Sequence, residues 1–334
     1  MRILIATGIY PPDVGGPAEY ARNLKETFEN LGHGVEVSSF RIEKKLPTGI
    51  RHFWYFFKIL PKLFKADFIL ILDTFSAALP AILAAKIAGK KSVIRIGGDF
   101  LWESFVERTG KMIPLPDFYN TKTALSFKEK IIFRLTKFVL KNSSVLAFTT
   151  SWQKEIWMKP YGLQNEKCSV VENFYAPKES ASANGNPKFK NFIFAGRPIK
   201  LKNVERMEES FLRAKETGSD ASLHILSLPH HLLMESIKSC YAVILPSLSE
   251  VSPNFILEAI RFNKPFILTK HNGLNDRVKD IGLLVDPLNI DDIKEKILSL
   301  ANDKIYAEQM NKIKSFNFTH SWPQIAEEIL KISE

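Results

Sequence analysis

Residues 242–260 read Ala242-Val-Ile-Leu245-Pro-Ser-Leu-Ser-Glu250-Val-Ser-Pro-Asn254-Phe-Ile-Leu-Glu258-Ala-Ile260. The first four residues are bulky and apolar with no polar alternation, which is typical of a strand covered on both faces. Ser252 is a favourable N-cap and Pro253 a favourable first helical residue, so a helix is predicted directly after the strand. A strand that feeds a helix is the building unit of parallel sheets covered by helices.

The same unit recurs along the whole chain of 334 residues. Strands are predicted at Arg2–Ala6, Gly34–Phe40, Phe68–Leu72, Ser92–Ile96, Val145–Thr149, Phe192–Ala195, Ser222–Leu226, Ala242–Leu245, Phe266–Thr269 and Gly282–Val285. Amphipathic helices are predicted at Ala18–Asn30, Lys128–Lys141, Val204–Lys215, Ile290–Ala301 and Pro323–Ile332. Residues 176–190 lack apolar periodicity and predict a linker. We therefore expect two α/β domains, residues 1–175 and 191–317, that face each other across a cleft.

Composition excludes several classes of protein. A hydrophobic content of 45% and a charged content of 25% are those of a folded soluble chain, not of a disordered one. Two cysteines, Cys168 and Cys240, make neither a disulfide scaffold nor a cysteine metal site, and they fit a reducing compartment. The apolar window Phe68–Ala85 contains Asp73 and Pro80, so a strand feeding a helix explains it better than a membrane span. Because no basic leader with an apolar core opens the chain, we expect a cytoplasmic protein.

Basic charge is concentrated in the first half of the chain. The formal net charge is +10, and residues 1–175 hold 25 Lys and Arg against 16 Asp and Glu. An anionic partner too large for a pocket is therefore expected to meet this half, although no nucleic-acid-reading pattern accompanies the charge and we expect no nucleic acid. Within Arg51–Lys65, four basic residues fall in one narrow helical stripe and aromatic residues fill much of the remainder.

This aromatic and basic segment supports two interpretations. The first is a helix buried against the sheet with a basic solvent face, which we prefer because every doubly wound domain needs such helices. The second is a helix in peripheral contact with an anionic membrane. The charge imbalance of the first half keeps the second interpretation open.

Two predicted strand ends carry groups suited to an anionic ligand. The first strand is followed by Gly15 and Gly16, where the backbone can approach a ligand closely before a helix begins. The strand at Phe192–Ala195 is followed by Arg197 and Lys202, whose cationic side chains can hold a diphosphate. Taken alone, the glycine pair is better explained by a plain tight turn, and the basic pair by a solvated loop.

The turn and helix within residues 242–260 add carboxylates to this chemistry. Glu250 lies in the turn before the helix and Glu258 in its second turn, while the free amides of Asn254 and Phe255 open beside Glu250. A carboxylate can bind ligand hydroxyls, and a helix N-terminus can bind phosphate. The set predicts a site for a ligand that carries both groups.

Four segments resemble, in order, the family 4 retaining glycosyltransferases, which have the GT-B fold of two Rossmann-like parallel-sheet domains. They are Tyr10-Pro-Pro-Asp-Val-Gly-Gly16, Gly196-Arg197 with Lys202, Pro246-Ser-Leu-Ser-Glu250 through Glu258-Ala259, and Gly282-Leu-Leu-Val-Asp-Pro287. The third segment resembles the family's Glu-x7-Glu motif. The likeness covers essentially the whole chain, including a C-terminal helix at about 318–334 that in this fold crosses back onto the N-terminal domain.

The resemblance implies a hexosyltransferase-type enzyme (EC 2.4) that uses a nucleoside-diphosphate sugar and needs neither a cofactor nor a metal. Arg197 and Lys202 would neutralise the diphosphate, Glu250 would contact the donor sugar, and Glu258 would bind the ribose. The glycine pair after the first strand would let that loop close on the donor. The basic N-terminal half adds the hypothesis of a glycan or lipid-linked acceptor in cell-envelope polysaccharide biosynthesis, with the protein at the inner face of the membrane.

Some positions depart from the family pattern. Asp99 follows the fourth strand as in the family, and it is the N-terminal candidate for the general base that an inverting enzyme would need. Gly98 stands where a histidine is common, and Asn203 replaces a usual glycine. Two alternatives stay open: a GT-B sugar-nucleotide epimerase, against which the Glu-x7-Glu arrangement argues, and a catalytically inert nucleotide-sugar-binding subunit.

Overall fold

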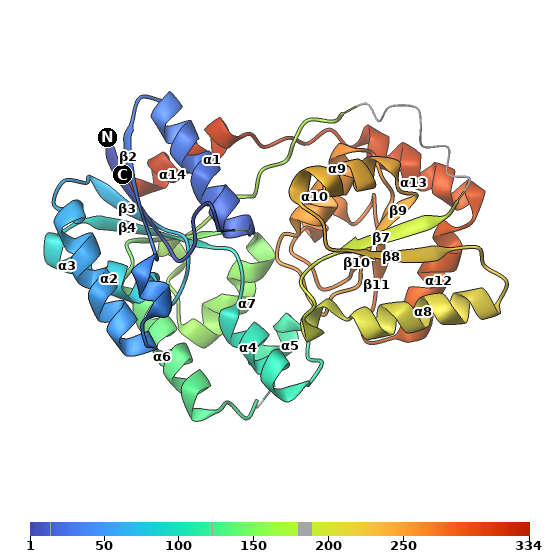
Figure 1. Ribbon diagram of the computed structural model, residues 1–334, viewed down its shortest axis with the longest axis horizontal. Coiled ribbons are helices and arrows are strands. Elements are labelled where there is room, and N and C mark those ends of the chain that lie inside the picture. The colour runs from blue at the N-terminus through green and yellow to red at the C-terminus, as the bar shows by residue number, and fades with distance from the viewer. Residues whose placement is uncertain (14, 122, 180–188) are drawn as a thin grey trace. The chain divides into compact units, whose positions relative to one another are not determined.

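The computed structural model describes residues 1–13, 15–121, 123–179 and 189–334. Val14 of the first motif and residues 180–188 of the expected linker lie outside the described residues. The chain divides into two compact units (Figure 1). Unit 1 consists of Met1–Leu101, Ala124–Phe174 and His320–Glu334, and unit 2 consists of Trp102–Thr123 and Tyr175–Thr319. Within the described ranges, no helix is both long enough and apolar enough to cross a membrane.

Unit 1 is built on a parallel sheet of six strands in the order β2-β1-β3-β4-β5-β6. Its strands are β1 (Arg2–Thr7), β2 (Gly34–Ser39), β3 (Phe68–Ile71), β4 (Lys91–Ile96), β5 (Val145–Phe148) and β6 (Cys168–Val170). Its helices are α1 (Gly16–Asn30), η1 (Ile42–Lys45), α2 (Thr48–Leu63), α3 (Ala78–Ala88), α6 (Phe127–Asn142), α7 (Ser151–Tyr161), η2 (Asn165–Lys167) and α14 (Trp322–Ser333). Figure 1 shows α1 and α14 on one face of this sheet, where Leu24 and Phe28 pack with Ile325 and Ile329.

Unit 2 is built on a parallel sheet of five strands in the order β11-β10-β9-β7-β8. Its strands are β7 (Asn191–Ala195), β8 (Ser222–Leu226), β9 (Ala242–Leu245), β10 (Phe266–Thr269) and β11 (Leu283–Val285). Its helices are η3 (Lys200–Lys202), α8 (Val204–Glu216), α9 (His230–Ser239), α10 (Asn254–Arg261), α11 (Asn275–Val278), α12 (Ile290–Leu300) and α13 (Asp303–Ser315). It also takes α5 (Leu115–Asn120) and nearly all of α4 (Phe100–Thr109) from a part of the chain expected in the N-terminal domain.

The predicted strands are confirmed, each to within one residue at either end. Fully apolar strands such as Phe68–Ile71, Ala242–Leu245 and Phe266–Thr269 are buried along their whole length, which is why they lack polar alternation. Strand β6 was not predicted, because three residues with only one buried side chain make no recognisable apolar run.

Helix α2 differs from the prediction of a basic solvent face. Tyr55, Ile59 and Leu63 are buried as expected, but three of the four basic side chains are bound within unit 1, and Lys65, after the end of the helix, is exposed. Lys58 pairs with the buried Glu43 at 2.7 Å, Lys62 pairs with Glu36 at 2.7 Å, and the Arg51 guanidinium donates to the backbone carbonyls of Glu43, Lys44 and Leu46. Helical spacing correctly predicts that the basic residues share one side of the helix. It does not reveal that β2 and η1 supply the carboxylates and carbonyls that bind them.

Gly282 occupies a position that only a glycine fits. A Cβ atom built there would lie 2.2 Å from Cε2 and 2.7 Å from Cζ of Phe266, and that ring is 1% exposed. Because the buried ring has no room to move, we expect Gly282→Ala to lower the free energy of unfolding by roughly 1–3 kcal/mol. Denaturant unfolding measures this change. Gly49→Ala is the control, because a Cβ there meets nothing within 4 Å; equal losses in both variants would contradict the packing argument.

Candidate functional site

The loops that follow three neighbouring strands of unit 2 gather at one edge of the sheet. Strands β10, β9 and β7 lie side by side and run parallel, so their carboxyl ends share that edge. Arg197 and Lys202 follow β7, Glu250 follows β9, and His271 follows β10. Open α/β sheets bind ligands beyond this edge.

Lys202 and Glu250 are in contact at this edge. Lys202 Nζ lies 2.5 Å from Glu250 Oε1, and the two side chains are only 16% and 11% exposed. The Glu250 backbone is also fixed, because its N–H donates to the His271 carbonyl at 3.0 Å and its carbonyl accepts the Gly273 N–H at 2.9 Å. The structure thus brings together two residues that are 48 positions apart in the sequence. Glu250 is fixed both by its backbone hydrogen bonds and by its ion pair with Lys202.

The structure shows why an asparagine suits position 203, where the family pattern has a glycine. Its φ of 60° lies in the left-handed region, which asparagine tolerates better than most residues other than glycine. Its side-chain amide donates to the carbonyls of Pro246 at 3.0 Å and Pro287 at 2.7 Å. Asparagine therefore supplies the backbone conformation of a glycine and, in addition, ties the η3 turn to the loops after β9 and β11.

Arg197 is bound differently from Lys202. Its side chain is 70% exposed, and NH2 lies 3.2 Å from Glu103 Oε2 on α4. The next basic residue, Lys200, donates its backbone N–H to Glu107 Oε1 at 2.6 Å, also on α4. Sequence reasoning missed both glutamates, since nothing in the sequence signals that α4 packs within unit 2. Arg197 is thus held beside the turn, on a partner that an anionic ligand could replace.

Helix α10 begins one residue later than predicted. Pro253, not Ser252, is the N-cap, and a proline side chain makes no capping hydrogen bond. Asn254 is exposed and Phe255 half-buried at the first two helical positions. Glu258 lies one turn further, where its Oε2 is 3.2 Å from NH1 of Arg261. The amide end of α10 follows the Glu250 loop directly, as a phosphate-binding helix would require.

His271 and the α5 segment border the Glu250 loop. Burial, together with the charge of Lys270, holds the pKa of His271 below its ordinary value, so the imidazole is neutral at pH 7. The backbone N–H of Leu115 on α5 donates to Ser249 Oγ at 2.9 Å. The loop is therefore supported by α5 as well as by β10.

The remaining predicted residues lie in unit 1. Gly15 has a φ of 148°, a value that favours glycine, and precedes α1, which begins at Gly16. Asp99 is 2% exposed, and its Oδ2 accepts the indole N–H of Trp157 at 2.8 Å. The carbonyl of Gly98 accepts a hydrogen bond from the Gln153 side chain at 3.2 Å. These contacts fasten the loop after β4 to α7.

A metal site was not predicted from the sequence. Across the described ranges, no cluster of three or more His, Cys, Asp or Glu side chains could hold a metal ion.

Comparison with known proteins gives three kinds of match. Residues 183–315 match the family described as glycosyl transferases group 1. The chain is 32% identical over 101 residues to an uncharacterized glycosyltransferase of Methanocaldococcus jannaschii, a match that spans 29% of this chain and 29% of that protein. The chain thus matches less than a third of the length of this curated relative.

Solved structures are similar over nearly the whole chain. Sucrose-phosphate synthase from Thermosynechococcus elongatus has a TM-score of 0.69 at 14% identity, covering 99% of this chain and 97% of that one. Anabaena HepE in complex with UDP has a TM-score of 0.67 at 14% identity, and the lipopolysaccharide outer core galactosyltransferase WaaB has 0.64 at 19%, each covering 99% of both chains. The prediction of the GT-B fold is confirmed.

Proposed function

We propose that this protein transfers a sugar from a nucleoside-diphosphate sugar to an acceptor hydroxyl with retention of anomeric configuration, a proposal that the match of residues 183–315 to the glycosyl transferases group 1 family supports. The observation that carries the proposal is the contact between Lys202 and Glu250 beside the amide end of α10. A carboxylate for sugar hydroxyls then adjoins an ammonium and helix amides for phosphate. Anabaena HepE, which has been solved in complex with UDP and with UDP-glucose, supports this donor class.

The proposed reaction breaks the bond between the sugar C1 and the diphosphate oxygen and forms a bond from C1 to the acceptor oxygen on the same face. The acceptor proton passes to the departing diphosphate, so no protein base is required. Arg197 and Lys202 stabilise the charge that this leaving group gains, and they are cations fixed before the reaction begins. A metal ion is not needed for that task, and Glu250 positions the sugar rather than attacking it.

The other predicted residues take supporting roles in the proposal. Asn254 and Phe255 supply backbone amides to the diphosphate, and Glu258 binds ribose hydroxyls. Gly15 and Gly16 allow close approach of the loop before α1 to the donor. Asp99 shapes the acceptor side through Trp157 and does not exchange a proton, since its carboxylate is buried and already accepts a hydrogen bond. The acceptor in this proposal is a glycan or lipid-linked molecule of the cell envelope, and the sugar a hexose.

A panel of nucleotide sugars tests the donor assignment by thermal shift in the presence of EDTA. One nucleotide sugar is expected to stabilise the protein, by about 2.7 kcal/mol at a concentration of 100 times its Kd. Transfer is then assayed with that donor, and NMR of the product anomeric proton reports the configuration. Epimerisation of the donor without an acceptor would identify an isomerase instead. Binding with neither hydrolysis nor transfer would identify a binding subunit.

The exposed face of α2 supports peripheral membrane contact as part of this proposal. Phe53, Trp54 and Phe57 are 67%, 52% and 54% exposed, and Phe64 after the helix is 61% exposed. Water-exposed aromatic side chains on a helix of a basic unit suit the boundary between lipid headgroups and acyl chains. We therefore place the protein at the cytoplasmic face of an anionic membrane, with the aromatic side chains and not the basic stripe as the inserted face.

Vesicle flotation checks this placement. The protein is expected to float with vesicles of phosphatidylglycerol and phosphatidylcholine, and Phe53→Ala/Phe57→Ala is expected to weaken the partition ~100-fold, because two aromatic side chains no longer leave water. Leu212→Ala removes a 62% exposed apolar side chain from unit 2 and is the matched control. Equal partition of both variants, or no flotation of the wild-type protein, would refute membrane contact through α2.

A further inference from the structure

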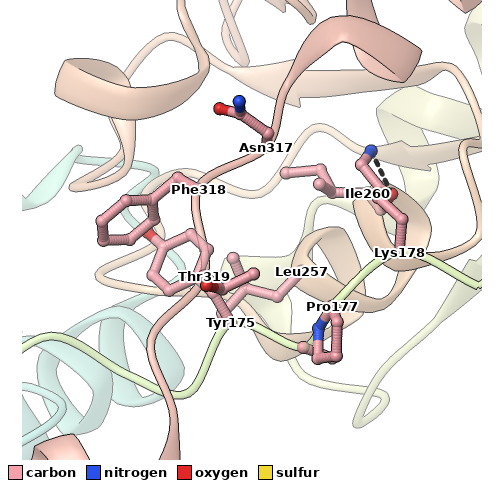
Figure 2. Close-up of a pocket in the computed structure, with 9 residues that line it drawn as sticks. Tyr175, Pro177, Lys178, Leu257, Ile260, Asn317, Phe318 and Thr319 are labelled. Carbon is pink, nitrogen blue, oxygen red and sulfur yellow. Dashed lines mark hydrogen bonds between the residues drawn. The ribbon is translucent and has the colours of Figure 1, made fainter.

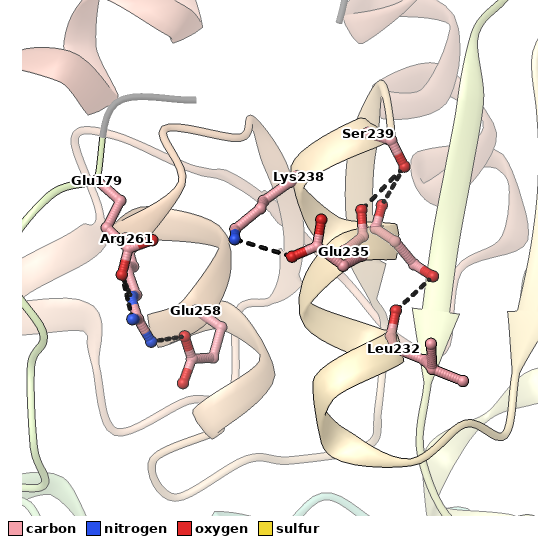
Figure 3. Close-up of polar contacts among 8 residues, drawn as sticks. Glu179, Leu232, Glu235, Lys238, Ser239, Glu258 and Arg261 are labelled. Carbon is pink, nitrogen blue, oxygen red and sulfur yellow. Dashed lines mark hydrogen bonds and ion pairs between the residues drawn. The ribbon is translucent and has the colours of Figure 1, made fainter. Parts of the chain in front are cut away.

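The C-terminal end of α10 holds an arginine that is shared by two carboxylates (Figure 3). Arg261 NH1 lies 3.2 Å from Glu258 Oε2, Nε lies 2.9 Å from Glu179 Oε1, and NH2 also contacts that Glu179 oxygen. Each edge of the planar guanidinium thus serves a different carboxylate. An isolated pair at positions i and i+3 of a helix contributes little, so the contact with Glu179 decides how firmly Arg261 is held.

Glu179 is held in place by its own backbone. Its N–H donates to the Arg261 carbonyl at 3.0 Å, and its carbonyl accepts from the Asn263 side chain at 3.4 Å. The preceding residue, Lys178, donates to the carbonyls of Ile260 at 2.6 Å and Ile313 at 2.9 Å, in the last turns of α10 and α13. The segment is therefore fastened to the C-terminal end of α10, where it borders a pocket of about 190 Å³ also lined by Leu257 and Ile260 (Figure 2).

This arrangement fixes the side chain of Glu258. Its Oε2 atom is held by Arg261, which leaves Oε1 to accept hydrogen bonds from another group. The side chain is 20% exposed, so a ligand can reach it. Without Arg261, the carboxylates of Glu179 and Glu258 would face each other with no cation between them and would repel. Arg261 thus settles where the free carboxylate oxygen of Glu258 lies.

We propose that Arg261, held by Glu179, is a positioning residue that orients Glu258 for hydrogen bonding to the ribose hydroxyls of the donor nucleotide. The inference rests on the proposed function, which assigns the ribose to Glu258. Arg261 itself does not touch the donor. Its effect is confined to the ribose contact and spares the diphosphate contacts of Arg197 and Lys202.

Calorimetry with free nucleotides tests the inference without an acceptor. The Kd values of UDP, ADP and GDP are measured, and the tightest of the three is compared with its 2′-deoxy and 3′-deoxy forms. Wild-type protein is expected to bind the ribonucleotide at least tenfold more tightly than the weaker-binding deoxy form. Arg261→Ala is expected to reduce that ratio to below threefold by weakening ribonucleotide binding alone, and Arg261→Lys, which keeps one cationic donor, is expected to restore part of it.

Arg213→Ala is the matched control, because Arg213 also lies between two carboxylates of unit 2, Glu209 at 2.5 Å and Asp291 at 3.5 Å. It is expected to leave the ratio unchanged. Glu258→Ala distinguishes failure of the proposed ribose site from failure of the positioning role of Arg261. A wild-type ratio in Glu258→Ala, or no binding of any of the three nucleotides, would refute the proposed ribose site. Two results would overturn the role of Arg261. In the first, the preference for the ribonucleotide over the deoxy form is lost in Glu258→Ala but kept in Arg261→Ala. In the second, Arg261→Ala and Arg261→Lys weaken the binding of the ribo and deoxy forms equally.

Discussion

Arg197→Ala is expected to lower the turnover number by ~100-fold while the free energy of unfolding changes by less than ~0.5 kcal/mol. The two effects separate because the side chain is 70% exposed and its ion pair with Glu103 is a surface pair, which contributes little to stability. In the proposed reaction the same guanidinium faces the charge that develops on the departing diphosphate. Steady-state transfer assays and denaturant unfolding measure the two quantities on the same preparation.

Lys200→Ala is the control from the same turn. Lys200 is an exposed cation whose ammonium donates to the Glu107 carbonyl at 3.1 Å, and the proposed reaction gives it no role. Its turnover is expected to stay within about twofold of the wild-type value. Wild-type turnover in Arg197→Ala would contradict the diphosphate assignment, and an equal loss in both variants would assign the effect to the charge of the turn as a whole.

Glu250→Gln is expected to reduce transfer by ~100-fold or more and also to destabilise unit 2 by roughly 1–3 kcal/mol. Stability falls here because Lys202, only 16% exposed, loses the carboxylate that neutralises it. Transfer falls because an amide oxygen is a weaker acceptor for sugar hydroxyls than a carboxylate. Unfolding curves and transfer rates measured together distinguish the two losses.

The double variant Lys202→Met/Glu250→Gln separates stability from chemistry at this pair. Replacing both partners of a poorly exposed ion pair by neutral groups is often close to neutral for stability. We therefore expect the double variant to regain most of the lost unfolding free energy while transfer stays at the level of the single variant or below. Additive losses of stability would show that the two side chains do not depend on each other.

The helices and strands could be predicted well because the burial of a helix or strand determines the pattern of apolar residues within its own sequence. Runs such as Ala242–Leu245 are apolar on both faces, and amphipathic stretches such as Val204–Lys215 have helical spacing. Contacts between distant segments produce no comparable pattern in the sequence. The resemblance to family 4 glycosyltransferases allowed Lys202 and Glu250 to be expected in one site, whereas Glu103, 94 residues from Arg197, could not be anticipated.

Two local predictions failed for reasons of backbone and partner chemistry. Ser252 has the right side chain for an N-cap, but Pro253 adopts an extended ψ of 112° and takes the cap position, so the helix starts after it. The basic stripe of α2 was located correctly on the helix, but its orientation depends on Glu36 and Glu43. A charge is assigned to solvent or to a partner only when the rest of the fold is known.

The division of each unit among separate stretches of the chain affects how the protein can be synthesised. Unit 2 needs both Trp102–Thr123 and the later segment Tyr175–Thr319, while the core of unit 1 lacks Ile325, Ala326 and Ile329 until the segment that follows unit 2 has been synthesised. Neither unit can complete its folding during translation before the other has been largely made. A gene fragment that starts at residue 175 would therefore encode unit 2 without α4 and α5, and Arg197, Lys200 and Ser249 would lose the partners that those helices supply.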